Sequence, residues 1–493
     1  MQKPILPKGT RDFNSEELYK RNYIINIIKD NFLRFGFNPI ETPSFERSET
    51  LLGKYGQEGE RLIFKILKSG DFLKDTNVDE IKELKYSDLS PKIVDKALRY
   101  DLTVPFARYV VQNQNNITIP FKRYQIQNVW RADRPQKGRF REFLQCDADV
   151  IGSKSLMQEI DFISLFDSVF SDLKLSGCQI KINTRKLLIA ICDIFDCQDK
   201  FTTLTNQLDK LDKLDNEVVK TNLIKAGFKQ NVVNSIFDVI ELSKNFTDNL
   251  ELLKSYFKSS EIGTEGISDI EYIFKYFSKN NLIKSELIFD IGLARGIDYY
   301  TGVIFEVTPP KNISMGSIAG GGRYDDLTEI FGLKNMSGIG ISFGLDRLFL
   351  IIEELNLFPE TPINSVKVLI LNFGNDFSYD LIQIANSLRK NNINTEFYPD
   401  SVSLKKQLNY ANKNMIPYVL FYGEEEKENL YFNLKDMNSG NQQKLSKDQL
   451  LKVLVENYLV QFIPFKNHIY SKKKTVRLNY LVTVLLFSSE TEI

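Results

Sequence analysis

The pattern of apolar and polar residues predicts a β-hairpin in the arginine-rich stretch Phe121–Gly152. Tyr124–Arg131 alternates in part between the two kinds of residue, which predicts a strand with Arg131 near its end. Arg134–Arg139 then supplies a proline and a glycine, which favour a turn. Phe140–Ile151 is again strand-like. The stretch is therefore expected to form two strands joined by a cationic turn.

A long segment of different character follows, at residues 187–280, without glycine-rich or arginine-rich clusters. Apolar residues recur in it at helical spacing, for example at Leu250, Leu253, Tyr256 and Phe257. Glycine-rich, strand-like sequence returns between Phe289 and Phe349. This order predicts one domain, formed by residues 1–186 and 281–358, that is interrupted by a helical insertion.

The region after Pro359 and Pro362 alternates between short apolar runs and amphipathic stretches. Strands are expected at residues 366–371, 394–398 and 418–422, and helices at residues 379–388 and 404–411. Alternating strands and helices indicate a small α/β domain with a largely parallel sheet, at residues 364–458. From Gln461 to Ile493 no coherent period is found, so this segment is treated as an unassigned tail.

Composition limits the class of protein. The chain has 493 residues, 42% of them apolar and 26% charged, which predicts two or three folded domains. Lys plus Arg and Asp plus Glu both number 64, so any surface for nucleic acid has to be local.

Cysteine and histidine are scarce. The four cysteines form no CxxC pair, and His468 in the tail is the only histidine, so neither zinc nor a disulfide framework is expected. The N-terminus lacks the order of a signal peptide, and the apolar run at residues 478–487 is too short to span a membrane. These features predict a soluble, cytoplasmic protein.

Seven cations lie within the predicted hairpin, of which Arg131, Arg139 and Arg141 could face a polyphosphate. A guanidinium group matches phosphate oxygens in shape and keeps its charge. A solvated, charged hairpin without a ligand is the alternative interpretation.

Three later segments also carry candidate chemistry. Leu293–Val307 places an arginine and two tyrosines before a strand-like run, which suits a small polar ligand or an ordinary hairpin. Gly316–Leu327 holds three consecutive glycines, which permit close backbone approach to a ligand, or a sharp turn without a ligand. The segment matches neither a P-loop nor a Rossmann motif. Arg347 falls in the first turn of a predicted helix, where a cation opposes the helix dipole by about 0.3–1 kcal/mol; this position favours a functional role.

Taken together, these segments resemble the histidyl-tRNA synthetase family of class II aminoacyl-tRNA synthetases over about residues 3–455. Segments around Pro43, from Val129 to Asp149, and at Gly344–Arg347 resemble class motifs 1, 2 and 3. Leu293–Tyr300 and Ala319–Asp325 are particular to the histidine enzymes. Asp101 and Asp149 resemble the eukaryote-type branch, whereas Arg134–Gly138 is similar to the bacterial loop. The resemblance implies an α+β catalytic domain with an antiparallel sheet, a helical insertion that touches the tRNA acceptor arm, and an α/β anticodon-binding domain.

The resemblance also implies roles for individual residues. Histidine would be bound by Asp101, Leu102, Thr103, Arg131, Gln145, Asp149, Arg295, Tyr299, Tyr300 and Tyr324. ATP would be bound by Arg131, Asp133, Arg139, Phe143 and Arg347. Arg295 and Arg131 would be catalytic, with Arg295 acting as the electrostatic catalyst at the α-phosphate. The other implied partners are Mg²⁺ with ATP, tRNA(His) and a second copy of the chain in a homodimer.

Two other functions are alternatives to this one. One is a non-catalytic histidine-binding relative, the regulatory subunit of ATP phosphoribosyltransferase. That paralogue lacks an anticodon domain and usually loses motif residues, whereas Arg131, Arg295 and Arg347 are all present here. The other is a different class II synthetase, which the Tyr299–Tyr300 pair and the Gly322–Asp325 segment argue against.

Overall fold

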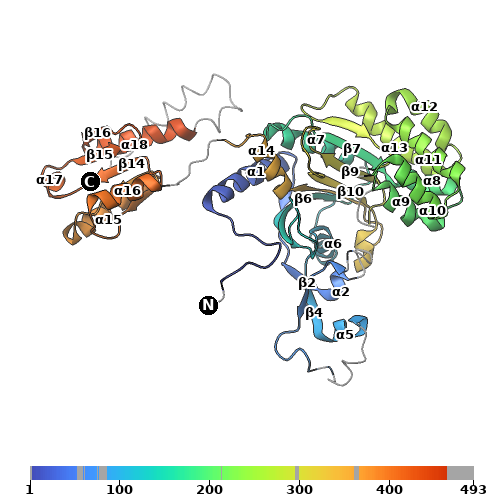
Figure 1. The fold of residues 1–493 in the computed structure, drawn as a ribbon, viewed down its shortest axis with the longest axis horizontal. Helices are drawn as coiled ribbons and strands as arrows, with labels where there is room; N and C mark the ends of the chain where they lie inside the picture. The colour runs from blue at the N-terminus through green and yellow to red at the C-terminus, as the bar shows by residue number, and fades with distance from the viewer. Residues whose placement is uncertain are drawn as a thin grey trace. The chain divides into compact units, whose positions relative to one another are not determined.

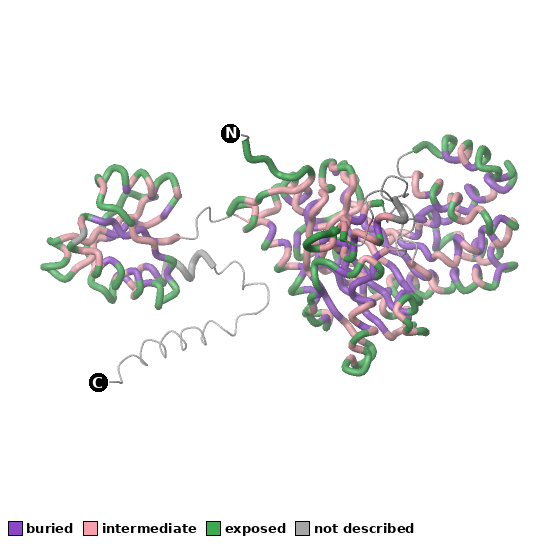
Figure 2. The backbone as a smooth tube through the Cα atoms, turned by 90° about the horizontal axis from the view of Figure 1, so that it is seen from below, coloured by how far each residue is buried: buried purple, intermediate pink, exposed green. Residues whose placement is uncertain are grey.

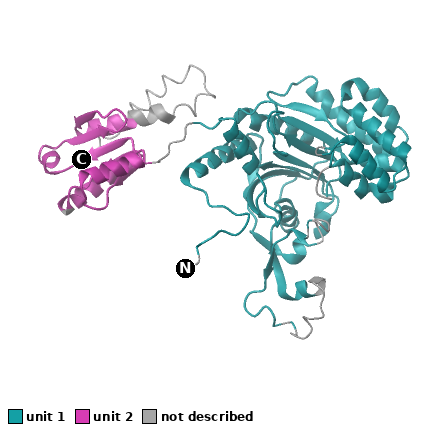
Figure 3. Ribbon diagram, viewed as in Figure 1, with its two compact units in different colours: residues 1–359 teal, residues 360–493 magenta. Residues whose placement is uncertain are grey.

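The computed structural model describes residues 3–52, 59, 61–74, 76, 86–211, 214–294, 299–359 and 366–462. It divides into two compact units, residues 1–359 and 360–493, which Figure 3 colours separately. Arg295 and the tail beyond Phe462, including His468, lie outside the described residues.

An eight-stranded sheet is the centre of the first unit (Figure 1). Its strands, in spatial order, are β1 (Asn38–Pro39), β5 (Phe121–Trp130), β6 (Glu142–Ile151), β11 (Gly338–Gly344), β10 (Ala319–Tyr324), β9 (Val303–Thr308), β7 (Gln179–Thr184) and β8 (Glu286–Phe289). All neighbouring pairs are antiparallel except β1 with β5 and β7 with β8 at the two edges. The expected hairpin of two long strands, β5 and β6, is confirmed.

One face of this sheet is covered by helices. They are α1 (Ser15–Arg34), α7 (Met157–Asp172) and α14 (Leu345–Glu354). Phe343 on β11 shows the packing, because its ring lies 6.0 Å from that of Phe32 on α1 and 5.4 Å from that of Phe166 on α7. Side chains alternate along a strand, so Ser342 beside Phe343 points to the opposite face. Figure 2 shows that the buried segments lie in the interior of the fold.

Helix α1 shows how the sequence sets an element's start. The Asn14 side chain accepts a hydrogen bond from the Glu17 amide at 2.9 Å, and the Asn14 amide donates to Glu17 Oε2 at 2.8 Å. This reciprocal cap satisfies two amides that a helix N-terminus leaves without partners. Ile24, Ile28 and Phe32 then follow at helical spacing and are fully buried.

Smaller elements complete the first unit. A three-stranded sheet is formed by β2 (Phe45–Arg47), β4 (Val94–Leu98) and β3 (Lys65–Leu67). Nearby are the helices α2 (Ser48–Leu51), α5 (Tyr86–Ile93) and α6 (Thr103–Gln112), and the 3₁₀ helix η2 (Leu327–Phe331).

The segment between β7 and β8 is helical, as its spacing predicts. Its elements are α8 (Arg185–Ile194), η1 (Gln198–Lys200), α9 (Phe201–Leu208), α10 (Asn216–Lys225), α11 (Gln230–Ser243), α12 (Phe246–Phe257) and α13 (Glu261–Phe277). On α12, Leu253 and Phe257 are fully buried, while Leu250 and Tyr256 pack beside them. One continuous apolar core joins these helices to the large sheet.

The second unit has a five-stranded sheet with helices on both faces. Its strands, in spatial order, are β13 (Thr395–Phe397), β12 (Val368–Ile370), β14 (Tyr418–Phe421), β15 (Phe432–Asp436) and β16 (Gln442–Leu445). Its helical elements are η3 (Asn375–Phe377), α15 (Ser378–Lys390), α16 (Leu404–Lys413), α17 (Glu424–Glu428) and α18 (Lys447–Phe462).

The expected largely parallel sheet in this unit is wrong in part. β13, β12 and β14 are parallel, but β15 and β16 add an antiparallel hairpin. A tight turn explains the difference, because Gly440 lies there with φ +76° and lets the chain reverse. The β16 residues are mostly exposed and polar, so the sequence has no apolar run there that would predict a strand.

Candidate active site

The hairpin of β5 and β6 places polar side chains on the face of the sheet opposite α1 and α7. Register pairs Arg123 with Asp149, Gln125 with Asp147, and Gln127 with Gln145. Directly opposed residues share a face, and so do residues two apart along a strand. On the other side of β6, strand β11 sets Ser342 opposite Asp147 and Gly340 opposite Asp149.

A cavity of about 60 Å³ lies against this polar face. Its lining is formed by Asp101, Thr103, Arg131, Gln145, Asp147, Asp149, Tyr299, Tyr300, Tyr324, Gly340, Ile341 and Ser342. Eight of the ten residues expected to bind histidine are among them. Leu102 is not, because its side chain is fully buried and only its carbonyl oxygen is engaged, by Arg123 Nη2 at 3.2 Å. The tenth residue expected to bind histidine, Arg295, lies outside the described residues.

Asp149 is held at one end of the cavity by two donors. Arg123 Nη2 lies 2.7 Å from Asp149 Oδ2, and the Tyr324 hydroxyl donates to Asp149 Oδ1 at 2.5 Å. Burial raises the pKa of Asp149, against the opposing effects of the Arg123 charge and the Tyr324 hydrogen bond. Burial also raises the pKa of Tyr300 and of Tyr324. Both phenols therefore stay protonated and can donate.

Asp101 and the tyrosines form another wall. Asp101 precedes α6, where its Oδ1 accepts from the Val104 amide at 3.1 Å, and its Oδ2 lies 3.4 Å from the Tyr299 hydroxyl. The Tyr299 ring is 5.0 Å from that of Tyr300 and 6.0 Å from that of Tyr324, in edge-to-face contacts. These contacts fix the walls of the cavity in the absence of a ligand.

Glycines on β10 and β11 allow the main chain to approach its neighbours closely, and one of them, Gly340, lines the cavity. Gly320–Gly322 lie inside strand β10, so the interpretation of a sharp turn is wrong, whereas close backbone approach to a ligand stays a prediction. A Cβ atom at Gly321 would overlap the Gly340 carbonyl oxygen, and one at Gly340 would overlap the Asp149 carboxylate. A Cβ at Gly322 would lie 2.9 Å from the Tyr300 ring.

Four of the five residues expected to bind ATP lie on the hairpin near its turn, and Arg131 among them also lines the cavity. Arg131 follows β5, donates from Nε to the Tyr100 carbonyl at 2.9 Å, and packs 4.3 Å from the Tyr100 ring and 5.3 Å from the Phe143 ring. Arg139 Nη2 pairs with Asp133 Oδ1 at 3.0 Å, and the Arg139 side chain stays 44% exposed, accessible to a ligand.

Arg347 approaches the same turn from helix α14, in whose first turn it lies as predicted. Its Nη1 donates to the Ser317 carbonyl, and a Cβ at Gly138 would come 3.0 Å from Arg347 Cγ. The hairpin turn and the start of α14 are therefore adjacent. Of the seven hairpin cations, Arg123 is not available to a phosphate, because it is buried against Asp149.

The N-terminal segment is bound to the same region. Arg11 Nη2 and Arg21 Nη1 both contact Asp346 Oδ1, at 2.6 and 2.5 Å. The Arg11 guanidinium also lies over the Phe140 ring, and the Gly9 carbonyl accepts from the Arg141 amide at 2.8 Å. These contacts connect the N-terminal segment to the hairpin and to α14.

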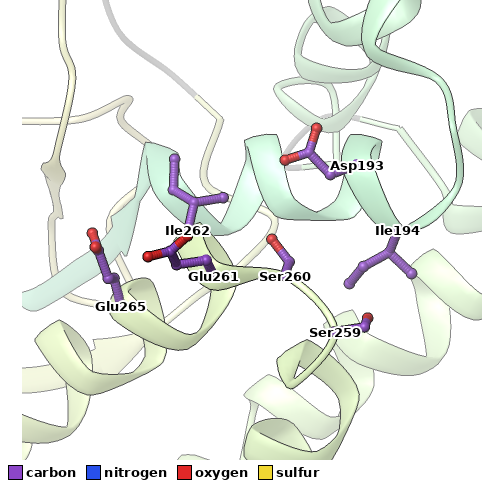
Figure 4. Close-up of a pocket in the computed structure, with 7 residues that line it drawn as sticks. All are labelled: Asp193, Ile194, Ser259, Ser260, Glu261, Ile262 and Glu265. Carbon is purple, nitrogen blue, oxygen red and sulfur yellow. The ribbon is translucent and has the colours of Figure 1, made fainter.

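A second hollow, of about 720 Å³, opens between the end of α8 and the start of α13 (Figure 4). Its lining is Asp193, Ile194, Ser259, Ser260, Glu261, Ile262 and Glu265. Ser260 Oγ already accepts from the Gly263 amide as a helix cap, and the charged lining is acidic. An acidic lining repels phosphate, so the cavity against the polar face of β6 is the better candidate for an active site that uses a polyphosphate.

Among the residues that the structure describes, no group of three or more His, Cys, Asp or Glu side chains is placed to hold a metal ion. No helix within the same residues is long and apolar enough to cross a membrane.

Sequence reasoning missed Asp147, Ser342, Gly340 and Ile341 as lining residues. A signal for Asp147 existed, because Gln145, Asp147 and Asp149 are two residues apart on a predicted strand and therefore share a face. Ser342 could be placed only once the register between β6 and β11 was known.

The antiparallel core of the sheet, the arginine-bearing hairpin β5–β6 and Arg347 in the first turn of α14 define a class II aminoacyl-tRNA synthetase. A family model described as histidyl-tRNA synthetase matches residues 71–348, and one described as an anticodon binding domain matches residues 367–457. The chain therefore belongs to the histidyl-tRNA synthetase family.

Individual relatives are similar to this chain in sequence over about nine-tenths of its length. Histidine--tRNA ligase of Christiangramia forsetii is 55% identical over 444 residues, which cover 90% of this chain and 97% of that protein. Histidine--tRNA ligase of Flavobacterium johnsoniae is 49% identical, covering 92% of this chain and 99% of that protein. The crystal structure of histidyl-tRNA synthetase from Nostoc sp. PCC 7120 superimposes with a TM-score of 0.75 at 26% identity, covering 93% of this chain and 100% of that one.

Proposed function

We propose that this chain is a histidine--tRNA ligase, which joins L-histidine to tRNA(His) in two steps at the expense of ATP. One observation carries the proposal. A cavity rich in carboxylates and phenols lies directly beside Arg131, with Arg139 and Arg347 at the adjoining hairpin turn. A small polar cation and a polyphosphate could therefore be bound side by side.

In the first step, a histidine carboxylate oxygen attacks the α-phosphorus of ATP and pyrophosphate leaves, which gives histidyl-adenylate. Arg131 is suited to orient that carboxylate and the α-phosphate, because it lies at the boundary between the two groups of residues. Arg139 and Arg347 are proposed to hold the outer phosphates, with Asp133 and Phe143 near the adenine. Arg295 is proposed to stabilise the charge that develops on the α-phosphate.

In the second step, a terminal ribose hydroxyl of tRNA(His) attacks the histidyl carbonyl carbon, and AMP leaves. The insertion at residues 187–280 is proposed to contact the acceptor arm, and residues 364–458 are proposed to bind the anticodon. The anticodon-binding model that matches residues 367–457 supports the second assignment. Mg²⁺ is proposed to accompany ATP and to neutralise charge on its phosphates. A homodimer and a cytoplasmic location complete the proposal.

The cavity explains how histidine could be selected. Carboxylates and phenols can bind an α-ammonium group and the two ring nitrogens. A site built for these hydrogen bonds rejects analogues that cannot make them, because its buried groups would then lose their partners. A regulatory histidine-binding role is not supported, because an anticodon-binding domain is present and the ligase relatives match over about nine-tenths of the chain.

Histidine-dependent exchange between ATP and pyrophosphate tests the first step, and histidyl transfer to tRNA(His) tests the second. We expect both activities from the purified chain. Folded protein that shows no exchange with any amino acid would overturn the proposal. Exchange that is driven by another amino acid and not by histidine would overturn the assigned substrate.

A further inference from the structure

Asp147 occupies the middle of the polar face that the cavity covers. It lies between Gln145 and Asp149 along β6, opposite Ser342 of β11 and Gln125 of β5. Its side chain is only 3% exposed, and it lines the cavity. Asp147 lies inside the segment Val129–Asp149 that resembles motif 2, but neither that resemblance nor the proposed mechanism gives it a role.

The three carboxylates that line the cavity differ in the donors they have. Asp149 Oδ1 accepts from the Tyr324 hydroxyl, and Asp101 has the Val104 amide and Tyr299. Asp149 Oδ2 has no hydrogen bond among the described residues, but its charge is paired with Arg123 Nη2 at 2.7 Å. For Asp147 the one donor identified is the Ser342 hydroxyl, and its buried Oδ1 has no hydrogen-bond partner among the described residues. Gln145 Oε1, two residues earlier on the same face, is likewise buried and has no hydrogen-bond partner among the described residues.

Such an acceptor is costly in a folded protein without a ligand. A buried carboxylate oxygen without a donor costs about 1–3 kcal/mol or more, so it is retained where a donor arrives later. Histidine carries suitable donors in its α-ammonium group and its ring N–H.

We propose that Asp147 is a specificity-determining residue of the histidine pocket, where its carboxylate accepts a hydrogen bond from an N–H group of the bound amino acid. The inference rests on the proposed function and assigns an additional residue to its substrate site. A charge-assisted hydrogen bond of this kind favours amino acids that place a donor at this depth of the pocket.

The ionisation of Asp147 gives a readout that a purely structural residue lacks. Burial raises the pKa of Asp147 to about 7. That pKa already includes the opposing effect of the Arg123 charge, the raising effect of the Asp149 and Asp101 charges, and the lowering effect of the Ser342 hydrogen bond. Tyr300, which faces the same group, stays protonated. Histidine binding should therefore weaken as the pH falls through about 7 and Asp147 takes up a proton.

The main test is Asp147→Asn, which keeps the shape of the side chain and removes its charge. We expect the KM for histidine in the exchange reaction to rise about tenfold to a hundredfold, because a hydrogen bond to a charged group is lost. The KM for ATP should change less than about twofold, because the nucleotide residues lie elsewhere.

The matched control is Asp167→Asn. Asp167 is equally buried, but its oxygens accept from the amides of residues 283–285, so this variant should lower stability and leave the KM for histidine unchanged.

Ser342→Ala provides a second, independent test and decides the matter if Asp147→Asn does not fold. It keeps the carboxylate but removes a hydrogen bond that lowers its pKa. The acidic limb of the pH profile for histidine KM should therefore move to higher pH. In Asp147→Asn that limb should disappear, leaving only the titration of free histidine.

Two competitive inhibitors identify the donor group. Histidinol keeps the α-ammonium group and the ring, whereas imidazolepropionate lacks the ammonium group. If Asp147 binds the ammonium group, Asp147→Asn weakens the binding of histidinol alone. If Asp147 binds the ring, the same variant weakens the binding of both inhibitors.

An unchanged KM for histidine in folded Asp147→Asn, or an unshifted acidic limb in Ser342→Ala, would overturn the inference while wild-type exchange still supports the proposed function. Lack of exchange in the wild type would instead remove the proposed function itself.

Discussion

Arg123 Nη2 lies 2.7 Å from Asp149 Oδ2, and both side chains are buried between the central sheet and the cavity. The Arg123 guanidinium also lies 4.3 Å from the centre of the Phe106 ring. A carboxylate that lines a cavity needs a fixed position if it is to recognise a ligand. Arg123, which itself does not line the cavity, supplies that position for Asp149.

Replacing Arg123 by Met should leave Asp149 as an unpaired buried charge. We expect the free energy of unfolding to fall by about 3–5 kcal/mol, measured by urea denaturation. The double variant Arg123→Met, Asp149→Asn should recover part of the loss, because the Asp149 charge that lost its partner is then removed as well. Arg34→Met is the control, since its pair with Asp172 is exposed and should contribute at most about 1 kcal/mol. Equal losses in the two single variants would contradict the assigned role of burial.

Stability should depend on pH through Asp147. Its folded-state pKa of about 7 lies above the ordinary value of 3.8, so the folded state binds a proton more readily than the unfolded chain. The free energy of unfolding should therefore fall as pH rises between about 4 and 7, by up to about 4 kcal/mol from this group. Urea denaturation of wild type and Asp147→Asn over this range measures the difference between them. Parallel curves would mean that Asp147 is ionised throughout.

Arg139 should act on ATP and not on histidine. Arg139→Gln removes a charged donor from the hairpin turn, and we expect the KM for ATP in the exchange reaction to rise at least about tenfold. The KM for histidine should stay near the wild-type value. Lys137→Gln is the matched control in the same turn, because Lys137 is exposed and lies 3.9 Å from Glu354. A similar rise in both variants would indicate general attraction by the cationic turn in place of a specific contact.

Arg295 should govern the chemical step. Arg295→Ala is expected to lower the rate of histidyl-adenylate formation at least about a hundredfold, the usual effect of removing one group that stabilises transition-state charge. Single-turnover formation of the adenylate measures this rate, and thermal denaturation checks that the fold is retained. A nearly normal rate in folded protein would refute the role of Arg295.

Local patterns were sufficient to predict much of the fold. Alternation in Tyr124–Arg131 predicted strand β5, and the spacing of Leu345, Leu348 and Ile352 predicted α14 with Arg347 in its first turn. Both signals depend on one face of an element being apolar, which sequence alone records. The mostly exposed, polar strand β16 carries no such signal and was not predicted.

Long-range pairing could not be read in the same way. Arg123 belonged to a group of seven hairpin cations in the sequence, and only the register of β5 with β6 sets it opposite Asp149 and away from any phosphate. The Asp133–Arg139 ion pair likewise depends on how the turn folds back. The family resemblance supplied eight residues of the cavity, but Ser342 became visible only from the pairing of β11 with β6.

The glycines at positions 320–322 and 340 restrict how the amino-acid pocket could be redesigned. Gly322 and Gly340 are opposed in the register, and side chains there would displace Tyr300 and Asp149. Substitutions on β10 or at Gly340 therefore could not adapt the pocket to bulkier or differently charged histidine analogues. Room has to be made on β6, at Gln145 or Asp147, or in the tyrosine wall. The main chain thus defines a fixed base, and variants that alter substrate range should come from the side chains around it.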